Sequence, residues 1–273
     1  MSYIPFINKT IKEAGALILR KSHTSYKVEE KAKNDLVTEV DKASEILITK
    51  AIKKAFPSHA VLGEEDNFKN GISDEIREAE YIWIVDPLDG TMNFVKDLPF
   101  YAVSIALFKK SGQAESKNFE YLEGEIIAGA VYIPRLDELF YAEKGKGAYL
   151  NGKKIHVSNV KTVGKSVLAT GFHLKGALQN LPYFEKIVGN CRAIRRFGAS
   201  AIDLVYAAAG RFDGYWEFNI KAWDIAAGVL IVEEAGGRIT DLNGNLLDLF
   251  GKQVLVSNGK IHKELVKIFG RVK

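Results

Sequence analysis

Residues 81–91 read YIWIVDPLDGT, and this stretch decides how the rest of the chain is interpreted. Five residues suited to a β-strand run straight into two acids, Asp86 and Asp89. A plain turn would explain Pro87 and Gly90, because Asp, Pro and Gly all favour turns. It does not explain two carboxylates three residues apart at the exit of a buried strand, because like charges repel and each loses hydration. Such a pair is stable mainly with a cation between its members, so the stretch predicts a metal site.

The neighbours of the two acids suit a phosphate as well as a metal. Hard divalent cations such as magnesium prefer oxygen ligands of this kind. Gly90 lets backbone N–H groups approach an anion closely, and Thr91 adds a hydroxyl that can orient a water molecule. The strand is therefore predicted to deliver a site for a metal-held phosphate.

Composition sets wide limits on the class of protein. The chain has 273 residues, 47% of them hydrophobic and 26% charged, which fits an ordinary soluble globular protein. No apolar run approaches the roughly 20 residues that a membrane span needs, and the N-terminal residues do not resemble a secretory signal. Cys191 is the only cysteine, which excludes an internal disulfide and a thiolate metal cluster. A cytoplasmic protein without a membrane partner is expected, and the mild net charge of +4 does not demand nucleic acid.

Strands and helices mix throughout the chain, which predicts an α+β or layered α/β unit. Residues 4–20 are predicted to form an amphipathic helix and residues 27–35 a loop. Asp41 suits the N-cap or first turn of a helix that Pro57 stops. Four residues of that helix are expected on its inner face: Ile46, Leu47, Ala51 and Ala55.

Later elements follow from the same patterns. Short strands are predicted at residues 61–66, 101–108, 125–133, 138–142, 147–152, 154–157, 167–170, 212–218, 238–241 and 253–258. Helices are predicted at residues 198–210 and 223–237 and from about residue 260. Ser200 and Asp203 resemble a capping box for the first of these.

Most motifs for other chemistries fail. G-x-S-x-G and H-E-x-x-H are both absent, and the five histidines are scattered singly, which weakens nucleophilic and zinc chemistry. GAYLNGKK (147–154) almost fits a phosphate loop, but lysine replaces the Ser or Thr, and strand-like residues follow where a helix should begin. That segment is predicted to be a β-turn.

Two further acidic groups add to the first. GEED (63–66) alone would be a solvated turn, and Asp224 alone would be an N-cap or first-turn residue favoured by the helix dipole. Together with Asp86 and Asp89, they supply acids from three places in the sequence. No histidine or thiolate cluster competes with them for a metal.

Three separate motifs carry a resemblance to a known family: WIVDPLDGTMNF (83–94), GEED (63–66) and WDIAAGVLIVEEAGG (223–237). They resemble the inositol monophosphatase family in order and separation, and the likeness extends from NDLVTEVD (34–41) to the final helix. The resemblance implies a layered αβαβα sandwich of the inositol monophosphatase and fructose-1,6-bisphosphatase type. It also implies one catalytic domain over residues 1–273, with lobes of roughly 1–134 and 135–273, and a homodimer.

The resemblance also implies roles for particular residues. The metal ligands would be Glu64, Asp86, the carbonyl of Leu88, Asp89 and Asp224, with Asp86 bridging two ions and Glu65 reached through water. The catalytic residues would be Glu64, Asp89, Thr91 and Asp41, with Asp41 supporting the Thr91 hydroxyl that orients the attacking water. The substrate contacts would be Gly90, Thr91, Ala199, Glu217 and Asp224.

The implied activity is that of a lithium-sensitive phosphomonoesterase with two or three Mg²⁺ ions per site. It would hydrolyse inositol-1-phosphate or related polyol phosphates by two-metal activation of water. Fructose-1,6-bisphosphatase activity is the close alternative, and a 3′-phosphoadenosine nucleotide phosphatase is disfavoured by TMNF at 91–94. A regulatory role in binding RNA or a transcription complex is the alternative from another class, and the charge gives it little support.

Two segments depart from the family pattern. The predicted hairpin at residues 109–124 is longer than usual and could alter the mouth of the site or an interface. The loop before NDLVTEVD holds Lys31 and Lys33, and the sequence does not show which of them, if either, has the lysine role that the family places there.

Overall fold

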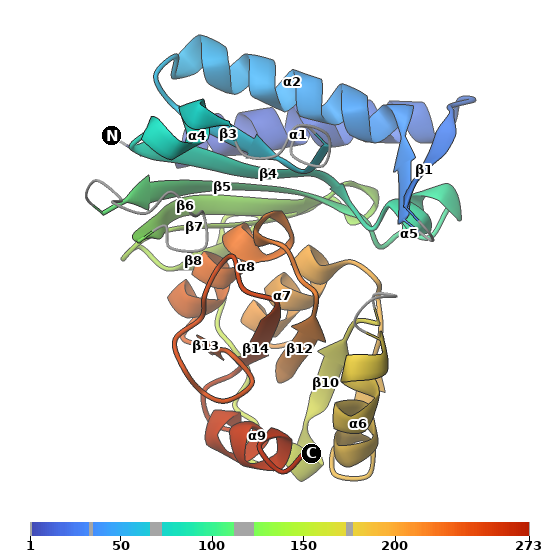
Figure 1. The fold of residues 1–273 in the computed structure, drawn as a ribbon, viewed down its shortest axis with the longest axis vertical. Helices are drawn as coiled ribbons and strands as arrows, with labels where there is room; N and C mark the ends of the chain where they lie inside the picture. Colours follow the sequence, from blue (N-terminus) through green and yellow to red (C-terminus); the bar gives the residue numbers. More distant parts are fainter. Residues whose placement is uncertain (1, 33–34, 66–72, 112–122, 173–176, 273) are drawn as a thin grey trace.

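The computed structural model describes residues 2–32, 35–65, 73–111, 123–172 and 177–272. Layers of helix and sheet alternate along the long axis of the molecule (Figure 1). Two helices cover a large sheet, two more separate it from a smaller sheet, and a last pair covers the far side of the smaller sheet. This arrangement confirms the predicted α+β class and the αβαβα order.

The larger sheet has seven strands in the order β3–β4–β5–β6–β7–β8–β9. β3 and β4 run parallel, and the other neighbouring pairs run antiparallel. Helices α1 (Ile4–Ser22) and α2 (Glu39–Ala55) cover its outer face (Figure 1). The strands are β3 (Ala60–Gly63), β4 (Tyr81–Asp89), β5 (Ala102–Lys110), β6 (Gly124–Ile133), β7 (Glu138–Glu143), β8 (Ala148–Leu150) and β9 (Lys153–Lys154).

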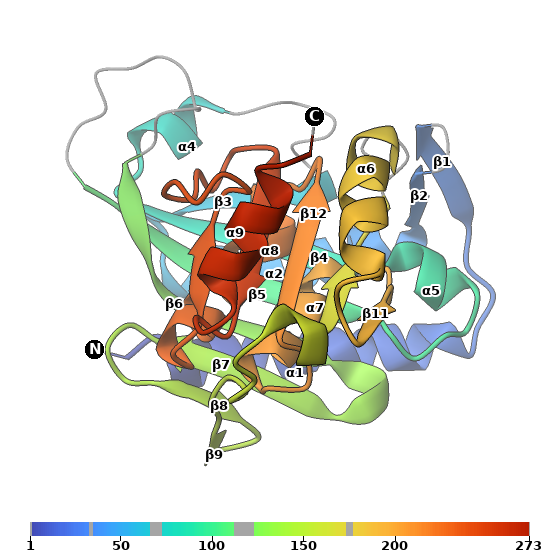
Figure 2. The same ribbon diagram turned by 90° about the horizontal axis from the view of Figure 1, so that it is seen from below.

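The smaller sheet has five strands in the order β11–β10–β12–β14–β13, with β10 parallel to both of its neighbours. Helices α7 (Ser200–Ala208) and α8 (Ala222–Glu234) lie between the sheets, and α6 (Ala177–Val188) and α9 (His262–Phe269) lie outside (Figures 1 and 2). The strands are β10 (Val167–Thr170), β11 (Ala193–Arg195), β12 (Gly214–Phe218), β13 (Arg238–Thr240) and β14 (Gln253–Ser257). The remaining elements of the described residues are short: β1 (Val28–Ala32), β2 (Asp35–Thr38), α4 (Asp74–Glu78), α5 (Thr91–Val95), η2 (Pro134–Leu136) and η3 (Val163–Lys165).

Three apolar clusters fill the spaces between the layers. One joins α1 and α2 to the larger sheet, another surrounds α7 and α8, and the third joins the smaller sheet to α6 and α9. Trp83 of β4 belongs to the first cluster, whereas Ile82 and Ile84 belong to the second. Since both faces of β4 are covered, the strand reads as a continuous apolar run rather than an alternating one.

The end of β4 is bulged where the two acids stand. Asp86 pairs with Ser104 and Asp89 pairs with Ala102, so β4 carries one residue more than β5 between these pairs. Bulges of this kind re-aim side chains and often lie beside active sites. The bulge therefore lies at Pro87 and Leu88, between the two acids.

The predicted loop at residues 27–35 is wrong. β1 and β2 form an antiparallel hairpin there, and it lies beside α5 in both ribbon views (Figures 1 and 2). The charged sequence VEEKA has little preference for a strand, and cross-strand pairing supplies what its composition does not. The strand predicted at residues 154–157 is also wrong beyond Lys154, where β9 ends.

The predicted inner face of α2 is only partly confirmed, since Leu47 packs against the apolar cluster of α1 and α2 while Ala55 is exposed. Ile46 is 53% exposed, whereas Ser44, Ile48 and Ile52 are fully buried. The polar Ser44 faces inward because its hydroxyl donates to the carbonyl oxygen of Pro87 at 2.9 Å. The apolar pattern alone therefore found only part of the inner face and missed its fully buried residues.

Other expectations can be placed directly. The GAYLNGKK segment forms the β8–β9 hairpin, with positive φ at Asn151 and Gly152, which confirms the β-turn.

Residues 112–122 of the predicted long hairpin lie outside the described residues. The expectation of one domain with two lobes stays a prediction. Within the described ranges, no helix is long and apolar enough to cross a membrane.

Candidate active site at the end of strand β4

Asp86 is the buried centre of the acidic group. Its side chain is 1% exposed, and its Oδ1 accepts a hydrogen bond from the backbone N–H of Leu88 at 3.0 Å. Burial raises the pKa of Asp86 well above its usual range. Three neighbouring carboxylates raise this pKa further: Glu64, Asp89 and Asp224. The four acids that the sequence singled out therefore act on one another in one region.

Asp89 joins the larger sheet to the first turn of α7. Its Oδ2 accepts a hydrogen bond from the backbone N–H of Ala201 at 2.8 Å. Burial raises the pKa of Asp89 to about 7, against the effect of that hydrogen bond, and the charges of Glu64 and Glu217 add to the rise. This carboxylate is costly to keep charged unless a cation or a proton compensates it.

Asp224 comes from the start of α8, where the sequence placed a first-turn acid. It is half-buried, and its Oδ2 accepts a hydrogen bond from the backbone N–H of Lys221 at 2.8 Å. Burial raises the pKa of Asp224 well above its usual range, and the charges of Asp89 and Glu217 raise it further. The helix between the two sheets thus points its N-terminal acid at the end of β4.

The acids that follow β3 are held by α2. Glu64 is half-buried, and Glu65 is 5% exposed. The backbone N–H of Glu65 donates to Oε2 of Glu45 at 2.9 Å, so an inward carboxylate of α2 fixes this turn. Asp66, the last acid of the GEED motif, lies outside the described residues.

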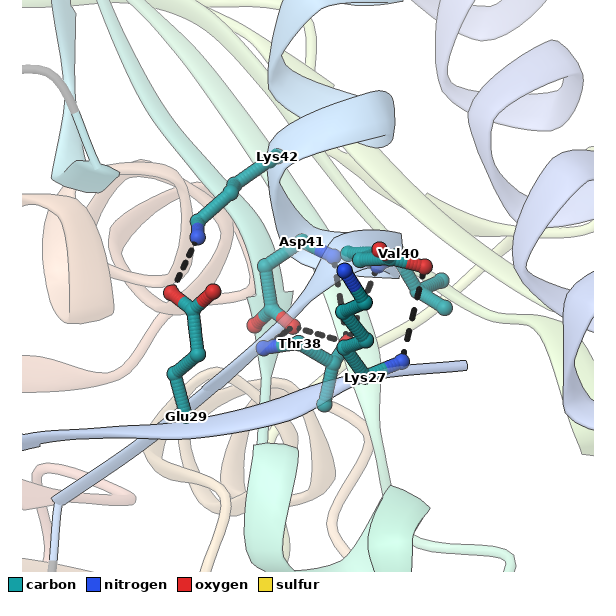
Figure 3. Close-up of polar contacts among 7 residues, drawn as sticks. Lys27, Glu29, Thr38, Val40, Asp41 and Lys42 are labelled. Carbon is teal, nitrogen blue, oxygen red and sulfur yellow. Dashed lines mark hydrogen bonds and ion pairs between the residues drawn. The ribbon is translucent and has the colours of Figure 1, made fainter. Parts of the chain in front are cut away.

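The Thr91 hydroxyl has a defined partner. It donates to Oδ1 of Asp41 at 2.8 Å and lies 3.0 Å from the carbonyl oxygen of Leu88. The other oxygen of Asp41 accepts hydrogen bonds from the N–H and the hydroxyl of Thr38, the N-cap of α2 (Figure 3). Because the proton of Thr91 points to Asp41, its oxygen can accept a hydrogen bond from a water molecule.

The β1–β2 hairpin is fastened beside Asp41. Figure 3 shows the ion pair between Glu29 on β1 and Lys42 on α2. The backbone N–H of Lys27 also lies 3.4 Å from Oε2 of Glu39. Lys33 lies outside the described residues, so the role of a lysine in this segment stays a prediction.

Gly90 permits the turn into α5. Its φ of 85° is in the left-handed region, and a Cβ there would lie 2.8 Å from the carbonyl oxygen of Phe100 and 3.1 Å from Cβ of Ala199. Asn93 strengthens the same junction, because its Nδ2 donates to the carbonyl oxygens of Phe100 at 2.6 Å and Phe197 at 2.8 Å. Gly90 and Ala199, predicted separately as substrate contacts, therefore lie against each other.

Glu217 lies on β12 and is 8% exposed. Its Oε2 accepts hydrogen bonds from the hydroxyls of Tyr215 and, at 3.2 Å, Ser200. Burial raises the pKa of Glu217. Tyr215 and Glu217 are two residues apart on one strand and so share a face, which is the sequence signal that could have identified Tyr215.

The predicted capping box at the start of α7 is wrong. The N-cap is Ala199, and Ser200 gives its hydroxyl to Glu217 instead. Asp203 is 1% exposed, and among the described residues its Oδ1 has no hydrogen-bond partner. Burial raises the pKa of Asp203 well above its usual range, with Glu217 and Asp89 adding to the rise. Asp203, predicted as a capping residue, is therefore buried beside Glu217 and Asp89.

The donors around Asp86 are of the chemical type that a hard divalent cation binds. Within the described ranges, no three His, Cys, Asp or Glu side chains are grouped closely enough to enclose a metal ion. The fit therefore rests on the buried negative charge and on donor chemistry, since carboxylates and a backbone carbonyl are the ligands that magnesium prefers. The metal, catalytic and substrate assignments of individual residues stay predictions.

Comparison with known proteins gives one consistent likeness. Residues 2–273 match the model of the inositol monophosphatase family. The chain is 39% identical to Nus factor SuhB of Pseudomonas aeruginosa, covering 96% of this chain and 94% of that protein. An IMPase structure from Thermotoga maritima matches with a TM-score of 0.84 at 34% identity, covering 100% of this chain and 98% of that one. SaIMPase-II with bound inositol monophosphate matches with a TM-score of 0.78 at 29% identity, covering 98% and 93% of the two chains.

Proposed function

The chain belongs to the inositol monophosphatase family, and from this premise we propose that it is a magnesium-dependent phosphomonoesterase acting on inositol-1-phosphate and related polyol phosphates. One observation supports the proposal most directly. Acids after β3, at the end of β4 and at the start of α8 raise the pKa of the buried Asp86, close to the Thr91–Asp41 pair. Such a buried excess of negative charge suits a site that binds divalent cations.

The proposed ligands of the cations are the side chains of Glu64, Asp86, Asp89 and Asp224 and the carbonyl oxygen of Leu88. When bound, the cations would lower the pKa of a water molecule and neutralise charge on the leaving oxygen. Asp86 is proposed to bridge two ions because it is the most deeply buried of these acids and feels the charge of the other three.

The chain's own groups would position the reactants. Backbone N–H groups of Gly90 and Thr91, at the start of α5, are available to the phosphate oxygens. The Thr91 oxygen accepts a hydrogen bond from the attacking water, because its own proton is given to Asp41. Glu64 takes the proton of that water as the new P–O bond forms and the bond to the leaving alcohol oxygen breaks. The proposed transfer is direct to water, with no covalent enzyme intermediate.

The test is phosphate release from Asp89→Asn and the wild type with magnesium. The change keeps the shape of the side chain and removes its charge, so activity should fall by about 100-fold or more. Asp74→Asn, on the exposed first turn of α4, is the matched control and should retain activity. A folded Asp89→Asn protein with unchanged magnesium-dependent activity would show that the metal assignment is wrong.

The same assay separates the substrate classes. Inositol-1-phosphate, fructose-1,6-bisphosphate and 3′-phosphoadenosine nucleotides are compared at one magnesium concentration, with and without lithium. We propose a preference for inositol and polyol phosphates and inhibition by lithium. A homodimer in the cytoplasm completes the proposal.

A second candidate function is supported by the relatives. Proteins 39% and 36% identical to this chain, from Pseudomonas aeruginosa and Escherichia coli, are Nus factors. We propose transcription-complex or RNA binding as a separate property, tested by retention of labelled RNA at increasing salt. The Asp89→Asn protein should bind as the wild type does if the two functions use different surfaces.

A further inference from the structure

The carboxyl group of Glu217 lies against Gly171, the residue that follows the neighbouring strand β10. Gly171 follows β10, which is paired with β12, and a Cβ built on Gly171 would overlap Oε1, Cδ and Oε2 of Glu217 together. Gly171 is not among the residues with positive φ, so its backbone would accept an alanine. Glycine is therefore required at position 171 because a larger side chain would overlap Glu217, and not because of its backbone conformation.

Asn180 on α6 fixes the backbone of Gly171 by hydrogen bonding. This buried amide donates to the carbonyl oxygen of Gly171 at 2.6 Å and to the hydroxyl of Thr170 at 2.9 Å. Its Oδ1 accepts a hydrogen bond from the indole N–H of Trp216 at 2.6 Å. Because α6, β10 and β12 are tied together, the glycine cannot move away from a larger side chain, and Glu217 would have to move instead.

Two hydroxyl donors hold the same oxygen of Glu217. Tyr215 donates to Oε2 along the strand, and Ser200 donates to Oε2 from the first turn of α7. Among the described residues, Oε1 has no hydrogen-bond partner, although the residue is only 8% exposed. The arrangement leaves one carboxylate oxygen available to accept a hydrogen bond at the site.

We propose that Gly171, Tyr215 and Ser200 are positioning residues that hold Glu217 with Oε1 directed at a substrate hydroxyl. The proposal deepens the proposed function and rests on it. The protein then selects phosphate monoesters whose alcohol carries a further hydroxyl over monoesters that lack one. A site built to pair with a hydroxyl discriminates strongly, because an analogue without the hydroxyl leaves the buried carboxylate unpaired.

The experiment compares two substrates, inositol-1-phosphate and phenyl phosphate, with wild type, Gly171→Ala and Gly189→Ala. In Gly171→Ala the ratio of kcat/KM for inositol-1-phosphate to that for phenyl phosphate should fall by about 10- to 100-fold, the effect of one lost hydrogen bond to a charged group. Gly189→Ala is the matched control, since a Cβ there meets no atom within 4 Å and its φ is not positive. Tyr215→Phe, which keeps the ring and removes one donor, should lower the ratio in the same direction.

A double-mutant cycle shows whether Gly171 acts through Glu217. Glu217→Ala should lower the ratio by itself. Adding Gly171→Ala to Glu217→Ala should then change nothing further, because the carboxyl that the new methyl group displaces is gone. An equal further loss in that background would overturn the proposal, because the methyl group would then act by another route.

The other outcomes are equally decisive. A wild-type protein with no preference for inositol-1-phosphate over phenyl phosphate, or a folded Gly171→Ala protein with the wild-type ratio, would overturn the proposal while leaving the phosphatase function in place. A wild type that hydrolyses neither substrate would overturn the proposed function itself. Circular dichroism of each variant identifies any that fails to fold.

Discussion

At the scale of single residues, the proposed chemistry depends on where the proton of Thr91 points. Asp41 accepts it through Oδ1, and two hydrogen bonds from Thr38 fix the other oxygen of the same carboxylate. Asp41 therefore cannot turn toward the site without breaking the N-terminal cap of α2. One carboxylate both caps a helix and makes a hydroxyl into an acceptor.

Thr91→Val tests that role. Valine has nearly the same shape but cannot accept a hydrogen bond from water, so kcat should fall by at least about 100-fold. Thr91→Ser keeps the hydroxyl and should keep most of the activity. Steady-state kinetics on inositol-1-phosphate compare the two variants, and similar kcat values for both would show that the hydroxyl does not orient the water.

At the scale of secondary-structure elements, one imidazole fixes α9 to the smaller sheet. His262 is 2% exposed, with Nε2 2.9 Å from the hydroxyl of Thr240 on β13 and Nδ1 2.9 Å from the hydroxyl of Ser257 on β14. Burial lowers the pKa of His262 to about 4, and the charge of Arg238 lowers it further. In the folded protein, His262 is therefore neutral near pH 7.

The pKa of His262 predicts how stability changes in acid. The unfolded chain, with a histidine pKa of about 6.5, binds this proton between pH 6.5 and about 4 while the folded chain does not. The free energy of unfolding should therefore fall by about 1 to 3 kcal/mol as pH drops through this window, on account of this residue. Urea unfolding of wild type and His262→Asn at pH 4.5, 5.5 and 7 measures it.

Comparing wild type with His262→Asn separates the effect of His262 on stability from the effects of the acidic residues at the site. The difference in stability between wild type and His262→Asn should shrink as pH falls, because only the wild type loses the neutral imidazole. His23→Asn, at an exposed position, serves as the control for loss of a histidine. A difference independent of pH would contradict the assigned pKa.

Elements with a strong apolar pattern could be predicted from the sequence, and elements held by polar contacts could not. The apolar runs of β4 and α8 were found because burial on all sides leaves few polar residues in them. The inner face of α2 was found only in part, because Ser44 is buried to donate to the carbonyl oxygen of Pro87. The β1–β2 hairpin was missed because its charged residues give no strand pattern.

The same distinction holds for the candidate site. The sequence singled out Asp86 and Asp89 from their place after a buried strand, and the roles proposed for Asp41 and Glu217 came from family resemblance. Gly171 could not be identified, because its importance depends on the pairing of β10 with β12 and on the direction of one carboxyl group. Contacts between elements distant in sequence leave no local pattern.

At the scale of the whole molecule, the helical layer formed by α7 and α8 packs against both sheets. A Cβ on Gly228 of α8 would lie 2.6 Å from Cβ of Leu204 on α7, and a Cβ on Gly129 of β6 would lie 3.1 Å from Cα of Ala227. Helices α7 and α8 thus pack closely on each other and on the larger sheet, while one apolar cluster continues into the smaller sheet. We therefore propose that residues 1–273 form one catalytic domain.

One domain should unfold in one step. Trp83 lies in the cluster of α1 and α2, and Trp216 lies in the cluster of α6 and α9, so tryptophan fluorescence reports on both outer parts of the molecule. Urea unfolding followed by fluorescence of Trp83→Phe and of Trp216→Phe should match far-UV circular dichroism of the same protein. Two separated transitions, one for each sheet, would show that the two lobes are independent domains.

The proposal tested most directly is that the buried carboxylates at the end of β4 form a divalent-cation site, in which the cation offsets their mutual repulsion. The most direct measurement is the melting temperature of wild type and Asp86→Asn, each with EDTA and with magnesium. Asp86 is 1% exposed, and an asparagine Oδ1 could still accept the N–H of Leu88, so the change removes charge with little change of shape. Magnesium should raise the wild-type melting temperature by several degrees, whereas Asp86→Asn should melt higher than wild type in EDTA and respond little to magnesium. A wild-type melting temperature unaffected by magnesium, or an equal magnesium response in both proteins, would contradict the account.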